Sequence, residues 1–102
     1  MRVILYVTFP TEEFNAAMKE GCVAAKIQRI LADTKPEAVY FGERSSGERG
    51  AVVVVDVPSA DKLPAVSEPW FLSFGAKVEV RIAMTPEDIA GMDLDTLAKK
   101  YA

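Results

Sequence analysis

The sequence predicts a two-layer α+β sandwich that follows the order β-α-β-β-α-β and adds short helices at its C-terminal end. Apolar and charged residues alternate from Lys77 to Met84, which is typical of a strand with one buried face. Apolar residues recur at intervals of three and four over 12–32, as in an amphipathic helix. A polar loop with two glycines, 44–50, lies between two β-branched segments, as in a hairpin. We expect one domain over residues 1–102.

The first strand is expected over residues 2–9, where β-branched and aromatic residues precede Pro10. Thr11 is the expected N-cap of one long helix over 12–32. Gly21 falls inside that helix, where it costs about 1 kcal/mol relative to alanine. We therefore expect close packing against the sheet to compensate for it.

The second and third strands are expected over residues 38–43 and 51–57. Four consecutive valines in the third strand predict a central strand that is covered on both faces. A two-layer monomer leaves one face of its sheet open, so this pattern favours a dimer. The charged residues around the intervening loop are expected to be solvated; they are Glu43, Arg44, Glu48 and Arg49.

Two short helices, over 60–66 and 68–74, are expected next because Pro64 and Pro69 cannot both lie inside one regular helix. Gly75 is a suitable residue to end the second one. The fourth strand should follow over 76–84. Its core-facing residues are expected to be Val78, Val80, Ile82 and Met84.

Two capped helices are expected after the fourth strand. Thr85 followed by Pro86 and two acidic residues is a strong helix start, and this helix should end near Gly91. Asp93 should cap a last amphipathic turn or two.

This order of elements corresponds to a ferredoxin-like sandwich with the first and third strands in the middle of an antiparallel sheet. The face of the sheet away from the helices then gathers Tyr6, Tyr40, Glu79 and Arg81. One interpretation is an interface with ion pairs and packed tyrosines. The other is an enclosed pocket, in which Arg81 binds an anionic group and Glu79 or a tyrosine transfers a proton.

Trp70 and Phe74 are a second pair of candidate ligand contacts. They could line a cleft between the second helical segment and the sheet. Aromatic residues at helical spacing also occur in cores, so a purely structural role is the alternative.

The composition argues against several classes of function. The net charge of −3 disfavours nucleic-acid binding, which depends on neutralising phosphates. The chain has no histidine for a metal, a haem or a neutral-pH base, so we expect no metal and no cofactor. The apolar run at 3–9 is too short to cross a membrane, and Cys22 is a lone cysteine. We expect a cytoplasmic protein without membrane contact.

The segment from Glu68 to Asp88, EPWFLSFGAKVEVRIAMTPED, resembles the C-terminal signature of an uncharacterised bacterial family among the dimeric α+β barrel proteins. That group includes muconolactone isomerase, EthD-like proteins and small antibiotic-biosynthesis monooxygenases. The resemblance implies two sheets packed face to face across a two-fold axis. It also implies a ligand in the barrel or in a cleft between sheet and helices, whereas the members that use haem or a His-Asp pair need a histidine.

The leading hypothesis is a homodimer that binds a small organic molecule in a pocket on the sheet face. One alternative is a cofactor-free isomerase or monooxygenase-like enzyme acting on a small aromatic or enol-like substrate, with Glu79, Tyr6 or Tyr40 transferring a proton. The other is an interaction module that pairs its fourth, edge strand with a strand of another protein.

Overall fold

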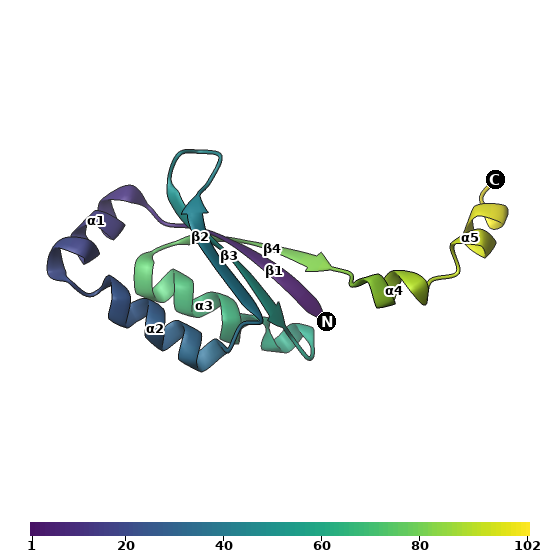
Figure 1. Cartoon of the computed structure of the whole chain (residues 1–102), viewed down its shortest axis with the longest axis horizontal. Helices are drawn as coiled ribbons and strands as arrows, with labels where there is room; N and C mark the ends of the chain where they lie inside the picture. The colour runs from purple at the N-terminus through teal and green to yellow at the C-terminus, as the bar shows by residue number, and fades with distance from the viewer.

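The computed structural model describes residues 1–102 and has four strands, five α-helices and one short 3-10 turn, Ala60–Lys62 (Figure 1). In chain order the elements are β1 (Arg2–Thr8), α1 (Thr11–Glu20), α2 (Val23–Thr34), β2 (Ala38–Glu43), β3 (Arg49–Asp56), α3 (Leu63–Phe74), β4 (Lys77–Ala83), α4 (Pro86–Ala90) and α5 (Leu94–Lys100).

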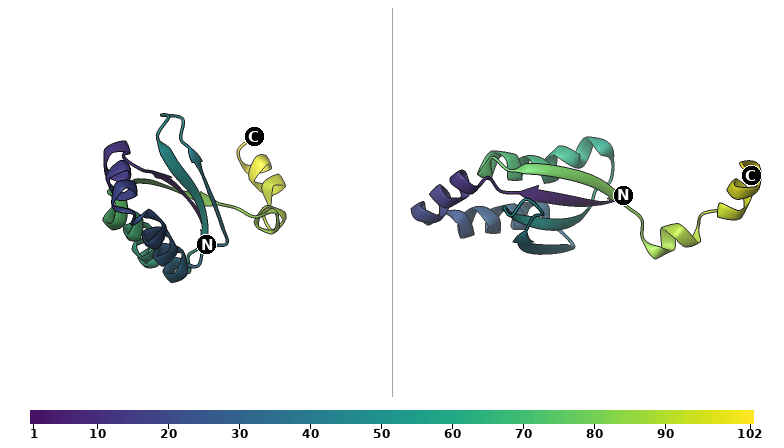
Figure 2. Two further views of the ribbon diagram at one scale, coloured as in Figure 1. Left: turned by 60° about the vertical axis from the view of Figure 1, so that its left-hand side comes forward. Right: turned by 90° about the horizontal axis from the view of Figure 1, so that it is seen from above.

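The four strands form one antiparallel sheet in the order β2-β3-β1-β4. The predicted α+β class, the ferredoxin-like layout, and the central position of the first and third strands are confirmed. Helices α1, α2 and α3 cover one face of the sheet, and no helix of the domain covers the other (Figure 2). No helix is long and apolar enough to cross a membrane.

The core lies between β1, β3 and the helices because alternate residues of these strands point toward the helix layer. Val3, Leu5 and Val7 of β1 are almost fully buried. Phe9, Trp70 and Phe74 pack beside them, with ring centroids 5.0 to 6.4 Å apart. This aromatic cluster joins α3 to the end of β1.

The expected long helix over 12–32 is wrong, because the chain forms two helices separated at Gly21. Gly21 has φ 73°, a left-handed conformation, and its amide donates to Met18 O in a helix C-terminal cap. A Cβ at Gly21 would meet no atom within 4 Å, so close packing does not explain this glycine. The helix also begins one residue early: Pro10 occupies the N-cap position that was expected for Thr11.

The two short helices expected over 60–66 and 68–74 are instead a 3-10 turn followed by the single helix α3. Pro64 lies in its first turn, where no intrahelical donor is needed. Pro69 lies inside the helix and leaves the carbonyl of Ala65 without its donor. Ala65 is exposed, so water can hydrate that carbonyl, and burial of Trp70 and Phe74 holds the helix against the sheet.

The expected core face of β4 is only partly covered. Val78 packs against the core, but Val80, Ile82 and Met84 are 40%, 70% and 60% exposed. α3 precedes β4 and does not extend over the end of this edge strand. The alternating pattern of β4 therefore predicted the strand correctly. The prediction that its apolar residues are buried within one chain was wrong for most of them.

Candidate functional site

We call the sheet face away from α1, α2 and α3 the open face. Register places the residues of neighbouring strands side by side on it. Its members, from the β2 edge to the β4 edge, are Ala38, Tyr40 and Gly42, then Gly50, Val52, Val54 and Asp56, then Arg2, Ile4, Tyr6 and Thr8, then Lys77, Glu79, Arg81 and Ala83.

Three of the predicted site residues lie in one row across the open face. Tyr40 pairs with Val52, Val52 with Tyr6, and Tyr6 with Glu79. Strands are spaced by about 4.8 Å, so the backbones of Tyr40 and Tyr6 are about 10 Å apart. Arg81 lies in the next row, beside Ile4. The sequence therefore correctly predicted which residues share this face, and the structure spreads them across its width.

The charged pair at the β4 edge is open to solvent. Arg81 Nη2 lies 3.5 Å from Glu79 Oε2, and the two side chains are 68% and 60% exposed. Solvent screens a pair of this kind, so it contributes little to stability. Its guanidinium remains available to a ligand or to a second copy of the chain.

Two arginines flank the ring of Tyr6. The guanidinium carbon of Arg44 lies 4.9 Å from the ring centroid, and that of Arg81 lies 5.9 Å from it. Arg44 is half-buried, and its Nε is buried without a hydrogen-bond partner. The expectation that Arg44 is only a solvated loop charge is wrong.

Gly50 allows Arg44 to lie across the open face. A Cβ at Gly50 would collide with the carbonyl oxygen of Val7 and would lie 2.5 Å from Arg44 Cδ. The aliphatic part of the Arg44 side chain therefore occupies the space that a larger residue at position 50 would take. The hairpin itself is held by the Arg44 amide, which donates to Glu48 O at 2.8 Å.

A shallow hollow of about 180 Å³ lies beside Arg44 on the open face. Gly42 and Gly50 are opposite each other in the register, so no side chain rises from that part of the sheet. A Cβ at Gly42 would meet nothing within 4 Å. The open-face residues that line the hollow are Tyr40, Gly42, Arg44, Gly50 and Val52.

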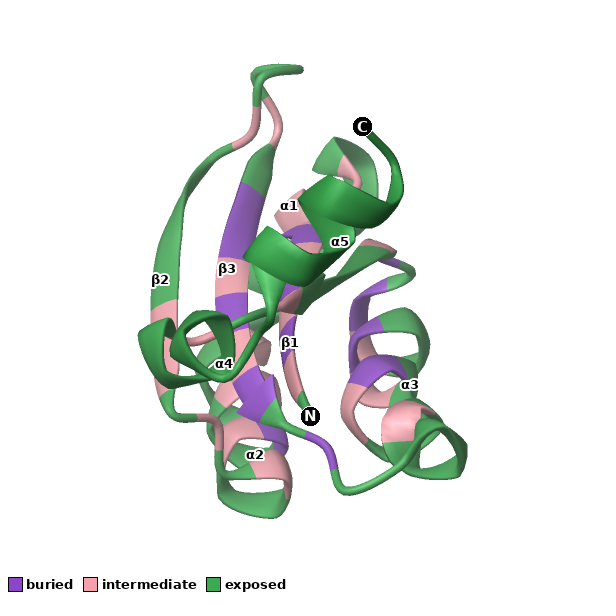
Figure 3. Cartoon of the chain, turned by 90° about the vertical axis from the view of Figure 1, so that its right-hand side faces the viewer, coloured by how far each residue is buried: buried purple, intermediate pink, exposed green.

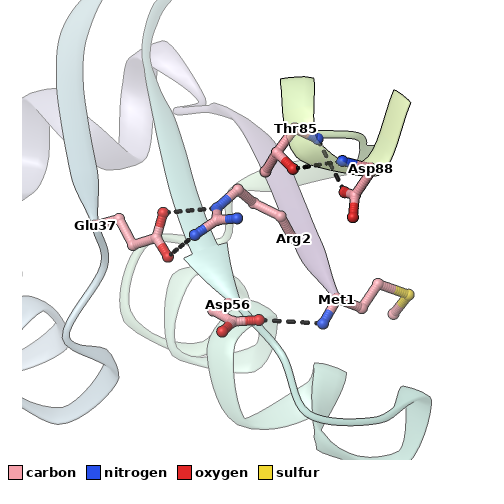
Figure 4. A network of polar contacts seen from close by, with 6 residues as sticks. All are labelled: Met1, Arg2, Glu37, Asp56, Thr85 and Asp88. Carbon is pink, nitrogen blue, oxygen red and sulfur yellow. Dashed lines mark hydrogen bonds and ion pairs between the residues drawn. The ribbon is translucent and has the colours of Figure 1, made fainter. Parts of the chain in front are cut away.

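At the other end of the open face, the charges are paired with each other (Figure 4). Arg2 donates two hydrogen bonds to the Glu37 carboxylate, at 2.8 and 2.6 Å, and the N-terminal ammonium lies 3.1 Å from Asp56. The hydrogen bond from Arg2 lowers the pKa of Glu37. The charges at this end of the open face are therefore paired with each other. The cations of the open face that have no acidic partner lie toward the end with the hollow.

Trp70 and Phe74 lie on the opposite side of the sheet from these groups. They are 0% and 4% exposed and belong to the core. Within this chain they are packing residues, which is the alternative that the sequence left open. No group of histidine, cysteine or carboxylate side chains in the structure could hold a metal ion.

Sequence reasoning missed Arg44, Gly42 and Gly50. A glycine inside a strand marks a close approach or a missing side chain, so Gly42 carried a usable signal. Arg44 carried none, because a loop residue takes its direction from tertiary contacts.

The chain matches no protein-family model, and no curated protein matches its sequence. What the open face can do therefore follows from its geometry.

Proposed function

We propose that the protein is a cytoplasmic homodimer that binds a small, planar organic anion on the open face of its sheet. The hollow beside Gly42 and Arg44 carries this proposal. Its floor is the backbone of Gly42, Tyr40 lies on one side, and the Arg44 side chain, which lies over Gly50, forms the other. An aromatic or enol-like ring fits such a floor, and its anionic group fits an arginine.

Charge supports an anion as the ligand. Arg44 and Lys77 make no ion pair with an acidic side chain, whereas Arg2 is paired with Glu37. A bound carboxylate would accept hydrogen bonds from the terminal nitrogens of the Arg44 guanidinium, since Nε itself is buried. The open face is thus better suited to an anion than to a cation.

The size of the hollow supports a dimer. Pockets that hold drug-sized ligands have volumes of about 300 to 1,000 Å³. The hollow has only about 180 Å³ and is open above. A second copy packed on the open face would cover Val52 and Val54, which are half-buried, and would close the hollow from above.

Titration with 2-hydroxybenzoate, a planar aromatic anion, tests this function. We expect the backbone amide resonances of Gly42 and Gly50 to shift, and neutral benzamide to cause no such shift. Gly42→Val places a side chain in the hollow, at a position where its Cβ meets no atom within 4 Å, and should lower the affinity for 2-hydroxybenzoate at least about tenfold. Shifts that survive Gly42→Val would place the probe elsewhere and contradict the proposal.

Arg49 provides a matched control for Arg44. Its guanidinium also stacks on an aromatic ring, that of Phe14 at 5.0 Å, but it lies on the helix side and donates to Asn15 Oδ1. Arg44→Gln should weaken 2-hydroxybenzoate binding by about 10-fold or more, since a hydrogen bond to a charged group contributes about 1.5–3 kcal/mol. Arg49→Gln should leave it unchanged.

The cofactor-free enzyme remains a prediction. The proton-transfer group proposed for it, Glu79, is exposed and paired with Arg81. Loss of turnover on Glu79→Gln, with binding of the substrate retained, would support catalysis. The interaction module also remains a prediction, because β4 is an edge strand with one side unpaired.

A further inference from the structure

The last nineteen residues form a segment that leaves the domain. We call residues 84–102 the C-terminal arm; it contains α4 and α5 and extends beyond the end of β4 (Figure 1). Apart from Thr85, which is half-buried, every residue of the arm is exposed (Figure 3). The arm therefore contributes almost nothing to the core of its own chain.

The arm nevertheless carries large apolar side chains. In α5, Leu94, Leu97 and Tyr101 are spaced by three and four residues and so lie on one helix face, and they are 50%, 51% and 76% exposed. Further apolar side chains lie at Met84, Ile89 and Met92, and Ile82 precedes them on β4. Exposed apolar surface of this extent marks an interaction site.

Both arm helices are specified locally but are too short to persist alone. Thr85 and Asp88 form a reciprocal capping box at α4, and the Asp93 side chain accepts from the Thr96 amide at α5. The helices have only five and seven residues, and isolated helices shorter than about 12 residues are marginal in water. They need a surface to pack on.

The dimensions of the chain show how much surface is left uncovered. The radius of gyration is 17.0 Å, whereas a compact chain of this length has about 13 Å. The accessible surface is 7008 Å², against about 5,700 Å² for a folded monomer of 11.1 kDa. Two copies thus carry an excess of about 2,600 Å², which is the size of a permanent dimer interface.

We propose that the C-terminal arm of each copy packs its apolar face on a second copy of this chain. The arm extends along the long axis of the molecule past the end of β4, where its own chain offers it no surface to pack on (Figures 1 and 2). The inference shares the homodimer with the proposed function but uses none of its ligand-binding residues.

Limited trypsin digestion of the full chain tests the arm. Trypsin cuts after Lys99 and Lys100 in α5, and Lys62 in the 3-10 turn before α3 is an exposed reference site in the domain. We expect cleavage at Lys99 and Lys100 to slow as the protein concentration rises through the dimer dissociation constant, and cleavage at Lys62 to change far less. Arm cleavage that is fast in a dimer of proven mass would overturn the inference. So would protection that persists in dilute monomer, since the arm would then fold on its own chain.

Two matched double variants add an independent measurement of dimer affinity by sedimentation. Leu94→Ser with Leu97→Ser removes the apolar face of α5 and should weaken the dimer at least about tenfold. Asp95→Ser with Lys99→Ser changes the opposite face and should leave the affinity within about twofold. Equal affinities for the two variants would overturn the inference.

These outcomes separate the arm from the ligand site. If the variant with Leu94 and Leu97 replaced binds 2-hydroxybenzoate normally and dimerises with unchanged affinity, that result would contradict the inference about the arm and leave the proposed function intact. Concentration-dependent protection of Lys99 and Lys100 without any binding of 2-hydroxybenzoate would support the packing of the arm on a second copy and contradict the proposed ligand site.

Discussion

Arg44 changes what the open face can bind. Its side chain crosses Gly50 and places a guanidinium over Tyr6, where Arg81 approaches from the other side. Two cations around the half-buried ring of Tyr6, with the bare backbone of Gly42 beside them, are the features that the proposed binding of a planar anion uses. Every part of this arrangement depends on the missing side chain at position 50.

Gly50→Ala should destabilise the protein by about 1–3 kcal/mol, because its Cβ collides with backbone at Val7 as well as with the Arg44 side chain. Gly42→Ala lies opposite it in the same pair and meets no atom. It should change the free energy of unfolding by less than about 0.5 kcal/mol. Urea denaturation measures both, and equal effects would contradict the close packing at Gly50.

At the level of single residues, strand alternation predicted the open face well. Period two placed Tyr6, Tyr40, Glu79 and Arg81 on one side, and the register confirms it. The sequence pattern could not predict that Trp70 and Phe74 belong to the core of this chain, because aromatic residues both line clefts and fill cores. Burial in the folded chain separates the two.

The break between α1 and α2 shows where local and tertiary preferences differ. Apolar spacing continues through positions 17–31, so the sequence pattern reads as one helix. The left-handed conformation of Gly21 ends α1 instead, and α2 then starts afresh at Val23. Helical periodicity alone does not detect such a break, because the apolar stripe resumes in nearly the same phase.

Gly21→Ala distinguishes these two descriptions by the sign of its effect. In one continuous helix it would stabilise the protein by about 1 kcal/mol. With φ at 73° it should destabilise by about 1 kcal/mol, because alanine is strained in the left-handed region. Gly91→Ala, where φ is −82° and the Cβ has ordinary contacts, is the control and should be close to neutral. Thermal or urea unfolding gives the sign.

The arm helices should depend on pH through their caps. Hydrogen bonds from Thr85 lower the pKa of Asp88, and hydrogen bonds from Thr96 lower that of Asp93. A carboxyl whose pKa is lowered on folding stabilises the fold above its unfolded pKa of about 3.9, and this contribution is lost as the pH falls through the lower folded value.

We therefore expect α4 and α5 to lose helicity below about pH 4, measured by the Cα chemical shifts of residues 86–100. Thr85→Ala removes the capping box and should lower the helicity of α4 already at pH 7, leaving α5 unchanged. Unchanged shifts down to pH 2 would contradict a role for these caps.

At the scale of the whole molecule, two features remain incomplete in one chain. The open face has only a shallow hollow, and the C-terminal arm has apolar side chains without partners. Valines on both faces of β3 and apolar residues at the end of β4 are sequence signals of the same kind. The sequence shows that these residues are apolar, but it does not show what would bury Ile82 or Leu97, because both are exposed in the folded chain.

A crystal structure of the protein soaked with 2-hydroxybenzoate tests the central claim most directly. We predict two sheets packed open face to open face, with the probe over Gly42 and Gly50 and its carboxylate on Arg44. An open face filled completely by side chains of the second copy, or left facing solvent with the probe elsewhere, would contradict it.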